Sequence, residues 1–215
     1  MSISGIVVAA GEGARFGVPK QFEAVAGIRL VDRAVEAVEL ACDEVVVVLP
    51  GGVAWDGKPV TVSVPGGSTR SASVRAGLDA IAGSATVVVV HDAARPLAPP
   101  SLFDAVISAV RAGADAAVPG LPISDTVKRV DDDRVVETIS RDGLVAVQTP
   151  QAFLVRALRA AHAAAGEATD DAALVEAGGG RVVVVPGDPR NLKITTPADL
   201  VVAAALLVPS SEERR

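Results

Sequence analysis

The strongest constraint on the fold is an alternation between short apolar runs, rich in β-branched residues, and longer stretches with helical spacing. The runs are nearly continuous in hydrophobicity, which is typical of parallel strands that are covered on both faces. Alternation of strand and helix predicts right-handed crossovers and an α/β fold with a doubly wound sheet. The predicted strands are residues 3–10, 45–49, 60–64, 86–90, 114–119 and 181–185.

The segments between these runs carry apolar stripes with the period of a helix. The first stripe consists of Val31, Ala34, Val35 and Val38, which share one helical face. Later stripes are Val74, Leu78 and Ile81, and then Leu102, Val106 and Val110. Expected helix starts are Pro99–Pro100, Thr169 as an N-cap followed by Asp170 and Asp171, and Thr196–Pro197.

Residues 121–147 interrupt this rhythm because they have no helical period. Two short alternating runs, 125–130 and 134–139, flank three consecutive aspartates at 131–133. This pattern predicts a β-hairpin arm that projects from the domain. An isolated hairpin is only marginally stable in water, so we expect the arm to pack on a second subunit. The whole chain of 215 residues is expected to form one domain, 1–215.

Composition excludes several classes of protein. The longest apolar run, residues 200–208, is well short of the roughly 18 residues that a membrane span requires. Cys42 is the single cysteine, which excludes an internal disulfide, and we expect it to be buried. A net charge of −6 and the absence of tyrosine argue against a nucleic-acid surface. We therefore expect a cytoplasmic protein with neither a nucleic-acid nor a membrane partner.

The loop after the first predicted strand is the first candidate site. In open α/β sheets, ligands bind beyond the carboxyl ends of the strands. Small residues there let a nucleotide approach the backbone, and glycines free N–H groups for phosphate. Phe16 stands where a dinucleotide fingerprint or a P-loop would need glycine. Ala9, Ala10, Gly11 and Gly13 are the small residues of this loop, and Arg15 and Lys20 would neutralise a triphosphate.

Two further strand ends carry candidate residues. Gly66 and Gly67 open a hydroxyl-rich helix start that includes Ser73, and either ligand binding or helix capping would explain this segment. Asp92 ends a strand beside the predicted triphosphate site, where a carboxylate would hold Mg²⁺. Arg95 is suitably placed for a substrate phosphate, whereas we expect His91 to be structural.

Seven segments of the chain have to be considered together. In order, they are VVAAGEGARFGVPKQF, GGSTRSASV, VVHDAARP, SDTVK, VQTPQAF, TDDAALVE and NLKITTPADL. In this order and spacing they resemble the 2-C-methyl-D-erythritol 4-phosphate cytidylyltransferases, enzymes of the non-mevalonate isoprenoid pathway. The resemblance implies a Rossmann-like domain with a mixed, mostly parallel sheet, and a homodimer interlocked by the β-arm. It also implies transfer of CMP from CTP to 2-C-methyl-D-erythritol 4-phosphate, with Mg²⁺ and release of pyrophosphate. No second catalytic domain of the bifunctional relatives is expected.

The resemblance also implies a role for each matching position. Arg15 and Lys20 would stabilise charge on the CTP phosphates, Asp92 would hold the metal, and Gly66, Gly67 and Ser73 would contact the cytidine side. The methylerythritol phosphate would be held by Arg95, Thr126, Arg141, Thr149 and Lys193, some of them across the dimer interface. Two alternatives stay open: a ribitol 5-phosphate cytidylyltransferase, and a nucleotide-binding paralogue without catalytic activity.

Overall fold

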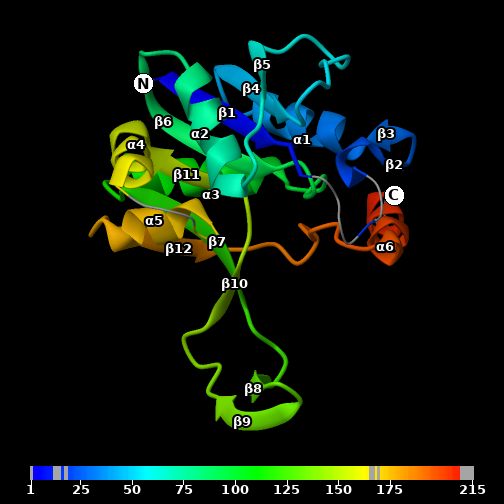
Figure 1. Ribbon diagram of the computed structural model, residues 1–215, viewed down its shortest axis with the longest axis vertical. Helices are drawn as coiled ribbons and strands as arrows, with labels where there is room; N and C mark the ends of the chain where they lie inside the picture. Colours follow the sequence, from blue (N-terminus) through cyan, green and yellow to red (C-terminus); the bar gives the residue numbers. More distant parts are fainter. Residues whose placement is uncertain (1, 12–15, 17–18, 165–167, 169, 209–215) are drawn as a thin grey trace, which may run out of the picture.

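The centre of the protein is an eight-stranded mixed sheet with the order β10-β7-β11-β6-β1-β4-β5, and β12 pairs with β7. The computed structural model describes residues 2–11, 16, 19–164, 168 and 170–208 (Figure 1). The strands are β1 (Ser2–Val8), β4 (Glu44–Leu49), β5 (Val62–Pro65), β6 (Ala85–Asp92), β7 (Ala116–Pro122), β10 (Val145–Val147), β11 (Gln151–Leu154) and β12 (Val182–Pro186).

The prediction of a doubly wound, mostly parallel sheet is confirmed. Strand β1 pairs in parallel with β4 on one side and with β6 on the other, and the β4–β5 and β7–β12 pairs are parallel as well. Every predicted strand forms. The sequence did not predict β10 and β11, which run antiparallel to their neighbours. Both are short, and β11 passes directly into the next helix, so neither has a distinct run of its own.

Helices cover both faces of the sheet. They are α1 (Leu30–Glu39), α2 (Arg70–Ala80), α3 (Pro100–Arg111), α4 (Val155–Ala164), α5 (Asp171–Ala177) and α6 (Pro197–Leu207). The stripes of α1 and α3 pack on one face in a single apolar cluster, and α2, α4 and α5 pack on the other face in a second cluster. Within β1, Ile6 belongs to one cluster and Val7 to the other, as the alternation of side chains along a strand requires.

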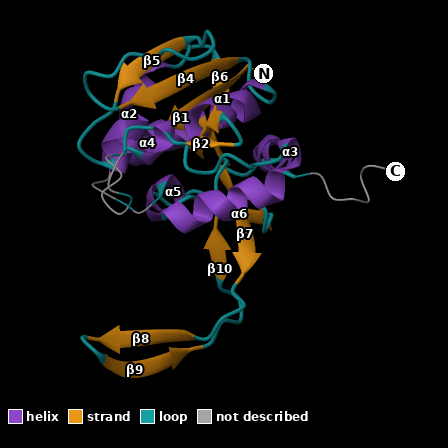
Figure 2. Ribbon diagram, turned by 90° about the vertical axis from the view of Figure 1, so that its right-hand side faces the viewer, coloured by secondary structure: helices purple, strands orange, loops and turns teal. Residues whose placement is uncertain are grey.

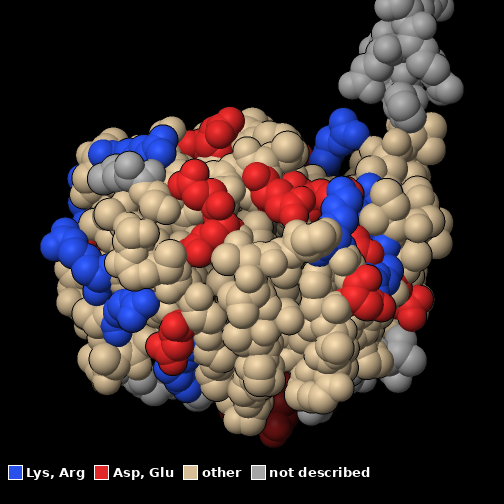
Figure 3. All heavy atoms as spheres, turned by 90° about the horizontal axis from the view of Figure 1, so that it is seen from above, with Lys and Arg blue, Asp and Glu red and all other residues tan. Residues whose placement is uncertain are grey.

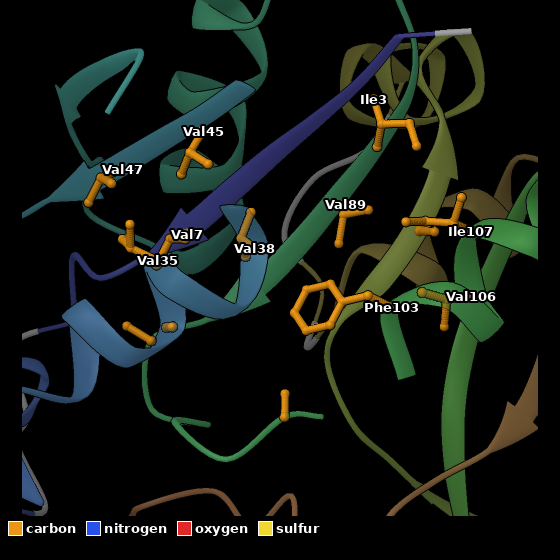
Figure 4. Close-up of a cluster of buried hydrophobic side chains, with 14 of the residues drawn as sticks. Ile3, Val7, Val35, Val38, Val45, Val47, Val89, Phe103, Val106 and Ile107 are labelled. Atoms are coloured by element: carbon orange, nitrogen blue, oxygen red, sulfur yellow. The ribbon is translucent and has the colours of Figure 1, made fainter. Parts of the chain in front are cut away.

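The first apolar cluster fills the space between one face of the sheet and the helices α1 and α3. Figure 4 shows Val35 and Val38 of α1 facing Val7, while Phe103 lies beside Val89 of β6. All of these side chains are almost completely buried. Burying a side chain of this size contributes about 1.5–3 kcal/mol, so the strand ends that carry the polar loops rest on a well-packed base.

The expected helix starts are partly confirmed. Helix α3 begins at Pro100 after Pro99, and α6 begins at Pro197 after Thr196, with Asp199 accepting from the Thr196 backbone N–H. For α5 the predicted N-cap is wrong by one position. The N-cap is Asp170, whose side chain accepts from the Ala173 N–H, because helical geometry begins only at Asp171. Thr169 lies outside the described residues.

The hairpin arm is present. Strands β8 (Val127–Asp131) and β9 (Arg134–Ile139) form a separate two-stranded sheet, which lies at the end of an extension from the main body (Figure 2). Residues 121–122 and 145–147 instead belong to β7 and β10, which pair with each other in the main sheet. The detached hairpin therefore spans 123–144, a shorter segment than the 121–147 that the sequence suggested.

A small peripheral layer packs beside the sheet. The 3₁₀ helix η1 (Lys20–Phe22) leads into a short hairpin of β2 (Ala24–Val25) and β3 (Ile28–Arg29). Val25 and Leu30 pack with Ile194 and with Ala203 of α6. Within the described part of the chain, no helix is both long and apolar enough to span a bilayer. Seen from above, acidic and basic side chains are interspersed on a mostly uncharged surface (Figure 3).

Candidate active site

A pocket of about 490 Å³ opens at the carboxyl ends of β1, β5 and β6. The chain passes from β1 through α1 to β4 on one side and returns through α2 to β6 on the other, so the strand order reverses at β1. Such a switch point is where open α/β sheets bind ligands. A hollow of about 600 Å³ beside α4 and α5 is larger, but alanine and glycine make up most of its wall. The pocket at the strand ends carries the converging polar groups that mark a ligand site.

Small residues after β1 form one wall of the pocket. Ala9, Ala10 and Gly11 all line it, and the Ala9 N–H donates to the carbonyl of Val48 at 2.8 Å, which fixes the start of the loop. No side chain larger than a methyl group projects from these positions, so a ligand can approach the backbone. Gly13 and Arg15 lie outside the described residues, and their predicted phosphate contacts stay predictions.

Lys20 lines the same pocket from η1. Its Nζ donates to the backbone carbonyl of Ile194 at 2.6 Å, which joins the loop after β1 to the segment before α6. Thr195 of that segment also lines the pocket. Two lysines, Lys20 and Lys193, thus reach the cavity from segments far apart in the sequence.

The loop between β5 and α2 both caps the helix and lines the pocket. The Thr69 side chain accepts from the Ala72 N–H at 3.1 Å, which makes Thr69 the N-cap. The Ser73 hydroxyl donates to the Thr69 carbonyl at 2.9 Å and accepts from the Gly67 N–H at 3.2 Å. Gly67 and Ser73 line the pocket, whereas Gly66 is not among the lining residues. A Cβ on Gly66 would lie 2.3 Å from that of Ala10, so close packing alone requires glycine there.

Asp92 is the carboxylate at the centre of the site. One oxygen accepts from Lys193 Nζ at 2.6 Å and the other lies 3.3 Å from Arg70 Nη2. Burial alone would raise the pKa of Asp92, but the positive charges of Arg70 and Lys193 outweigh it and hold the pKa well below its usual range. Asp92 is therefore ionised at any physiological pH.

Arg70 is a site residue that the sequence reasoning missed. It stands at the first position of α2, where the helix dipole disfavours a cation. An arginine at the start of a predicted helix was the sequence feature that could have identified Arg70, because a guanidinium at such a position needs a carboxylate partner. It has two partners here, Asp92 on the pocket wall and Asp171 at the start of α5. Burial would lower the pKa of Arg70, but these two carboxylates raise it.

His91 and Thr149 hold the backbone of Asp92 from the other side. His91 Nε2 faces the Arg95 carbonyl at 3.1 Å, so it must carry the ring proton and donate it. Nδ1 then accepts from the Thr149 hydroxyl at 3.2 Å, and Thr149 Oγ1 accepts from the Asp92 N–H at 3.0 Å. Burial lowers the pKa of His91 to about 4. This fully buried, neutral ring is what we expect of a structural histidine.

The remaining residues predicted for the alcohol side lie outside this pocket in the single chain. Arg95 donates to the carbonyls of Asn191 at 2.8 Å and Val147 at 3.3 Å, and burial lowers its pKa. Thr126 and Arg141 are exposed on the arm, where Arg141 donates to the Ser124 carbonyl. Of the predicted alcohol-side residues, Lys193 alone is among the described lining residues.

The described residues provide no cluster of three or more His, Cys, Asp or Glu side chains that could enclose a metal ion. Among the described lining residues, Asp92 is the one carboxylate. Mg²⁺ is commonly bound through one or two carboxylates together with substrate phosphates and water. An ionised carboxylate on the wall of a cavity of about 490 Å³, which has room for a substrate triphosphate, fits that mode of binding.

Comparison with known proteins gives a consistent result. The family model described as 2-C-methyl-D-erythritol 4-phosphate cytidylyltransferase matches residues 3–209. The enzyme of that name from Saccharopolyspora erythraea is 46% identical, with 96% of this chain and 100% of the relative covered. A bifunctional IspD/IspF enzyme from Clavibacter michiganensis is 49% identical over 91% of this chain, which spans 52% of that relative.

Solved structures agree with the sequence comparison. The crystal structure of 2-C-methyl-D-erythritol 4-phosphate cytidylyltransferase from Thermus thermophilus superposes with a TM-score of 0.83 at 39% identity. The match covers 96% of this chain and 98% of the other. The likeness therefore extends over both the sheet and the arm.

Proposed function

This chain belongs to the 2-C-methyl-D-erythritol 4-phosphate cytidylyltransferase family, and from that premise we infer that the pocket at the ends of β1, β5 and β6 is its active site. The reaction transfers the cytidylyl group of CTP to 2-C-methyl-D-erythritol 4-phosphate and releases pyrophosphate. The observation that carries the assignment is the ionised Asp92, held between Lys193 and Arg70 opposite a wall of small residues.

The chemistry requires no general base. A phosphate monoester has a second pKa near 6, so the attacking phosphate oxygen of the alcohol substrate is already anionic at neutral pH. That oxygen forms a bond to the α-phosphorus of CTP, and the bond from the α-phosphorus to the bridging oxygen breaks. His91 is buried with both ring nitrogens engaged, so it does not serve as a base for this step.

Catalysis then depends on bringing two polyanions together and on stabilising the charge that develops. Ala9, Ala10 and Gly11 leave room for the nucleotide, and Gly67 and Ser73 lie on the side assigned to cytidine. Lys20 and Lys193 point cationic groups into the cavity where a triphosphate would lie. Arg15 and Gly13 belong to the same loop and are assigned to the phosphates by their place in the motif.

Mg²⁺ is part of the proposal, with Asp92 as its ligand on the protein. The ion would neutralise phosphate charge and orient the triphosphate. Before the nucleotide arrives, Lys193 and Arg70 balance the charge of Asp92. With Asp92 assigned to the ion, Lys193 would turn its ammonium group to the phosphate of the alcohol substrate.

The arm is proposed to join two copies of the chain into a homodimer. Its valines Val130, Val135 and Val136 are each more than half exposed in the single chain, which is unfavourable unless a partner covers them. Thr126 and Arg141 would then contribute to the alcohol-phosphate site of the neighbouring subunit. Arg95 and Lys193 would act from the subunit that holds the nucleotide, where Thr149 holds the backbone of Asp92.

The family match supports the methylerythritol reading over the ribitol 5-phosphate alternative, which none of the reported comparisons favours. A cytoplasmic location is part of the proposal because both substrates are highly charged phosphorylated metabolites that do not cross membranes unaided.

The test is pyrophosphate release with Mg²⁺ and CTP, comparing 2-C-methyl-D-erythritol 4-phosphate with ribitol 5-phosphate. We expect release with the first substrate, loss of release with EDTA, and a large loss in Asp92→Asn. Release with ribitol 5-phosphate alone would overturn the substrate assignment. CTP binding without release from either substrate would indicate a non-catalytic paralogue.

A further inference from the structure

A line of charged side chains continues from the pocket into the protein behind it. Asp92 lies beside Arg70, and Arg70 Nη1 donates to Asp171 Oδ2 at 2.7 Å. The other oxygen of Asp171 lies 3.0 Å from His162 Nε2 on α4. Asp171 has no exposed surface, and both of its oxygens are engaged. The chain of contacts links β6 to α2, α5 and α4, which lie on one face of the sheet (Figure 2).

Local helix energetics do not account for Arg70. A cation at the first position of a helix is disfavoured by the dipole, and burying the Arg70–Asp171 pair carries a desolvation cost. An arginine can offset this desolvation free energy because its planar guanidinium group donates hydrogen bonds in two directions at once. Here it uses Nη1 for Asp171 and Nε with Nη2 for Asp92. The guanidinium is therefore a bridge between a buried anchor and the carboxylate of the pocket.

The two cations beside Asp92 differ in how firmly they are held. The Lys193 side chain is 40% exposed and meets Asp92 Oδ2. The Arg70 side chain is 25% exposed and is fixed from behind by Asp171. When Lys193 turns to a substrate phosphate, Arg70 still holds the other oxygen of Asp92.

We propose that Arg70 is a positioning residue that fixes the orientation of the Asp92 carboxylate, with Asp171 and His162 as its anchor. The inference rests on the proposed function in taking Asp92 to be the metal ligand. Residues that orient a metal-binding carboxylate alter metal affinity by about 10–100-fold when they are removed. If the Arg70–Asp171 ion pair only joined α2 to α5, its removal would lower the free energy of unfolding and leave metal affinity unchanged.

The test is Mn²⁺ binding in the presence of CTP, followed by the loss of the free-ion EPR signal, in the wild-type chain, Arg70→Lys and Asp171→Asn. Lysine keeps the positive charge but cannot bridge two carboxylates. We expect the dissociation constant of Mn²⁺ to rise about tenfold or more in both variants. At saturating metal, the KM for the alcohol phosphate should stay within about twofold, since neither change removes one of its predicted contacts.

Asp32→Asn is the matched control. It removes a carboxylate that accepts from Arg29 at 2.7 and 3.0 Å outside the pocket, and it should leave Mn²⁺ binding unchanged. Urea unfolding of all variants separates stability from metal affinity. If Asp171→Asn does not fold, the Mn²⁺ dissociation constant of Arg70→Lys is sufficient to test the inference.

An unchanged Mn²⁺ dissociation constant in Arg70→Lys would overturn the inference, whether or not the variant loses stability. The inference would also be overturned if Asp92→Asn bound Mn²⁺ as tightly as the wild type. Pyrophosphate release by the wild type would still support the proposed function in that case. Weakened Mn²⁺ binding in both bridge variants, with no pyrophosphate release from the wild type, would uphold the inference and overturn the proposed function.

Discussion

Lys193 donates a hydrogen bond of 2.6 Å to Asp92, although 101 residues separate the two in the sequence. The pair brings the segment before α6 to the end of β6 and places a cation and an anion in one pocket. Without a ligand they neutralise one another, so each is available only when the other has found a new partner. Under the proposed function, this ion pair would couple the metal side of the site to the alcohol-phosphate side.

Replacing Lys193 with alanine should therefore affect the alcohol substrate more than CTP. We expect kcat/KM for 2-C-methyl-D-erythritol 4-phosphate to fall about 100-fold or more, as for loss of a charged group that stabilises a transition state. The dissociation constant of CTP with Mg²⁺ should change less than about threefold, because Asp92 keeps Arg70 as its partner. Steady-state kinetics and calorimetric titration with CTP measure the two effects. Equal weakening of both ligands would contradict this division.

Replacing Thr149 separates a positioning role from substrate contact. Its hydroxyl accepts from the Asp92 N–H and donates to His91 inside the protein. Thr149→Val should cost about 2 kcal/mol of the free energy of unfolding, because a buried N–H loses its acceptor. Thr149→Ser keeps the hydroxyl and should restore most of that loss. If Thr149→Val raised only the KM for the alcohol phosphate and left stability intact, the hydroxyl would serve the substrate instead.

Lys20→Ala should lower turnover far more than stability. Its ammonium group donates to the Ile194 carbonyl at the pocket rim, and this contact belongs to a peripheral segment of the fold. A phosphate in the transition state would lose a charged partner, and we expect kcat to fall about 100–1000-fold. Single-turnover kinetics and thermal melting measure the two quantities. An unchanged kcat would refute the phosphate role of Lys20.

The reactivity of the Cys42 thiol should depend on pH, and this prediction does not depend on the assignment of the active site. Burial raises the pKa of its thiol to about 12, and the charges of Asp43 and Glu44 add to the effect. The thiolate is the reactive form, so at pH 8 the folded chain should react with a disulfide reagent about 1000-fold more slowly than the urea-unfolded chain. The rate should keep rising with pH beyond 9, where an ordinary thiol levels off. Cys42 is the single cysteine, so the signal needs no correction.

The sequence predicted the fold well where hydrophobic patterning decides the structure. The parallel strands are continuous apolar runs such as Glu44–Leu49, and the stripe of α1 packs as expected. Strand β11 was missed because it is short and depends on pairing with β6 and β7, which are distant in sequence. The N-cap at Asp170 was placed one residue early because Thr and Asp are both good caps.

The site was predictable only in part, for a physical reason. Residues after strands are easy to find, because the topology brings the carboxyl ends of parallel strands to one edge of the sheet. Asp92 and Lys20 both line the pocket at that edge. Contacts between side chains are set by packing, which spacing along the chain does not encode. The Arg70–Asp171 pair joins residues 101 positions apart. The position of Arg70 at a helix start indicates a need for a carboxylate, but it does not indicate which one.

The arm yields a prediction about two subunits acting together. If Arg141 serves the neighbouring subunit's pocket, Arg141→Ala and Lys20→Ala each disable every site of their own homodimer. Each subunit supplies one pocket and one arm, so a mixed dimer contains one site with both defects and one site with neither. Random exchange of equal amounts should therefore restore about a quarter of the wild-type activity, because half of the dimers are mixed and each has one intact site. Mixing the variants after mild dissociation, with light scattering to check dimer formation, measures this recovery. Were Arg141 to act within its own chain, every mixed dimer would have one defect in each site, and no activity would return.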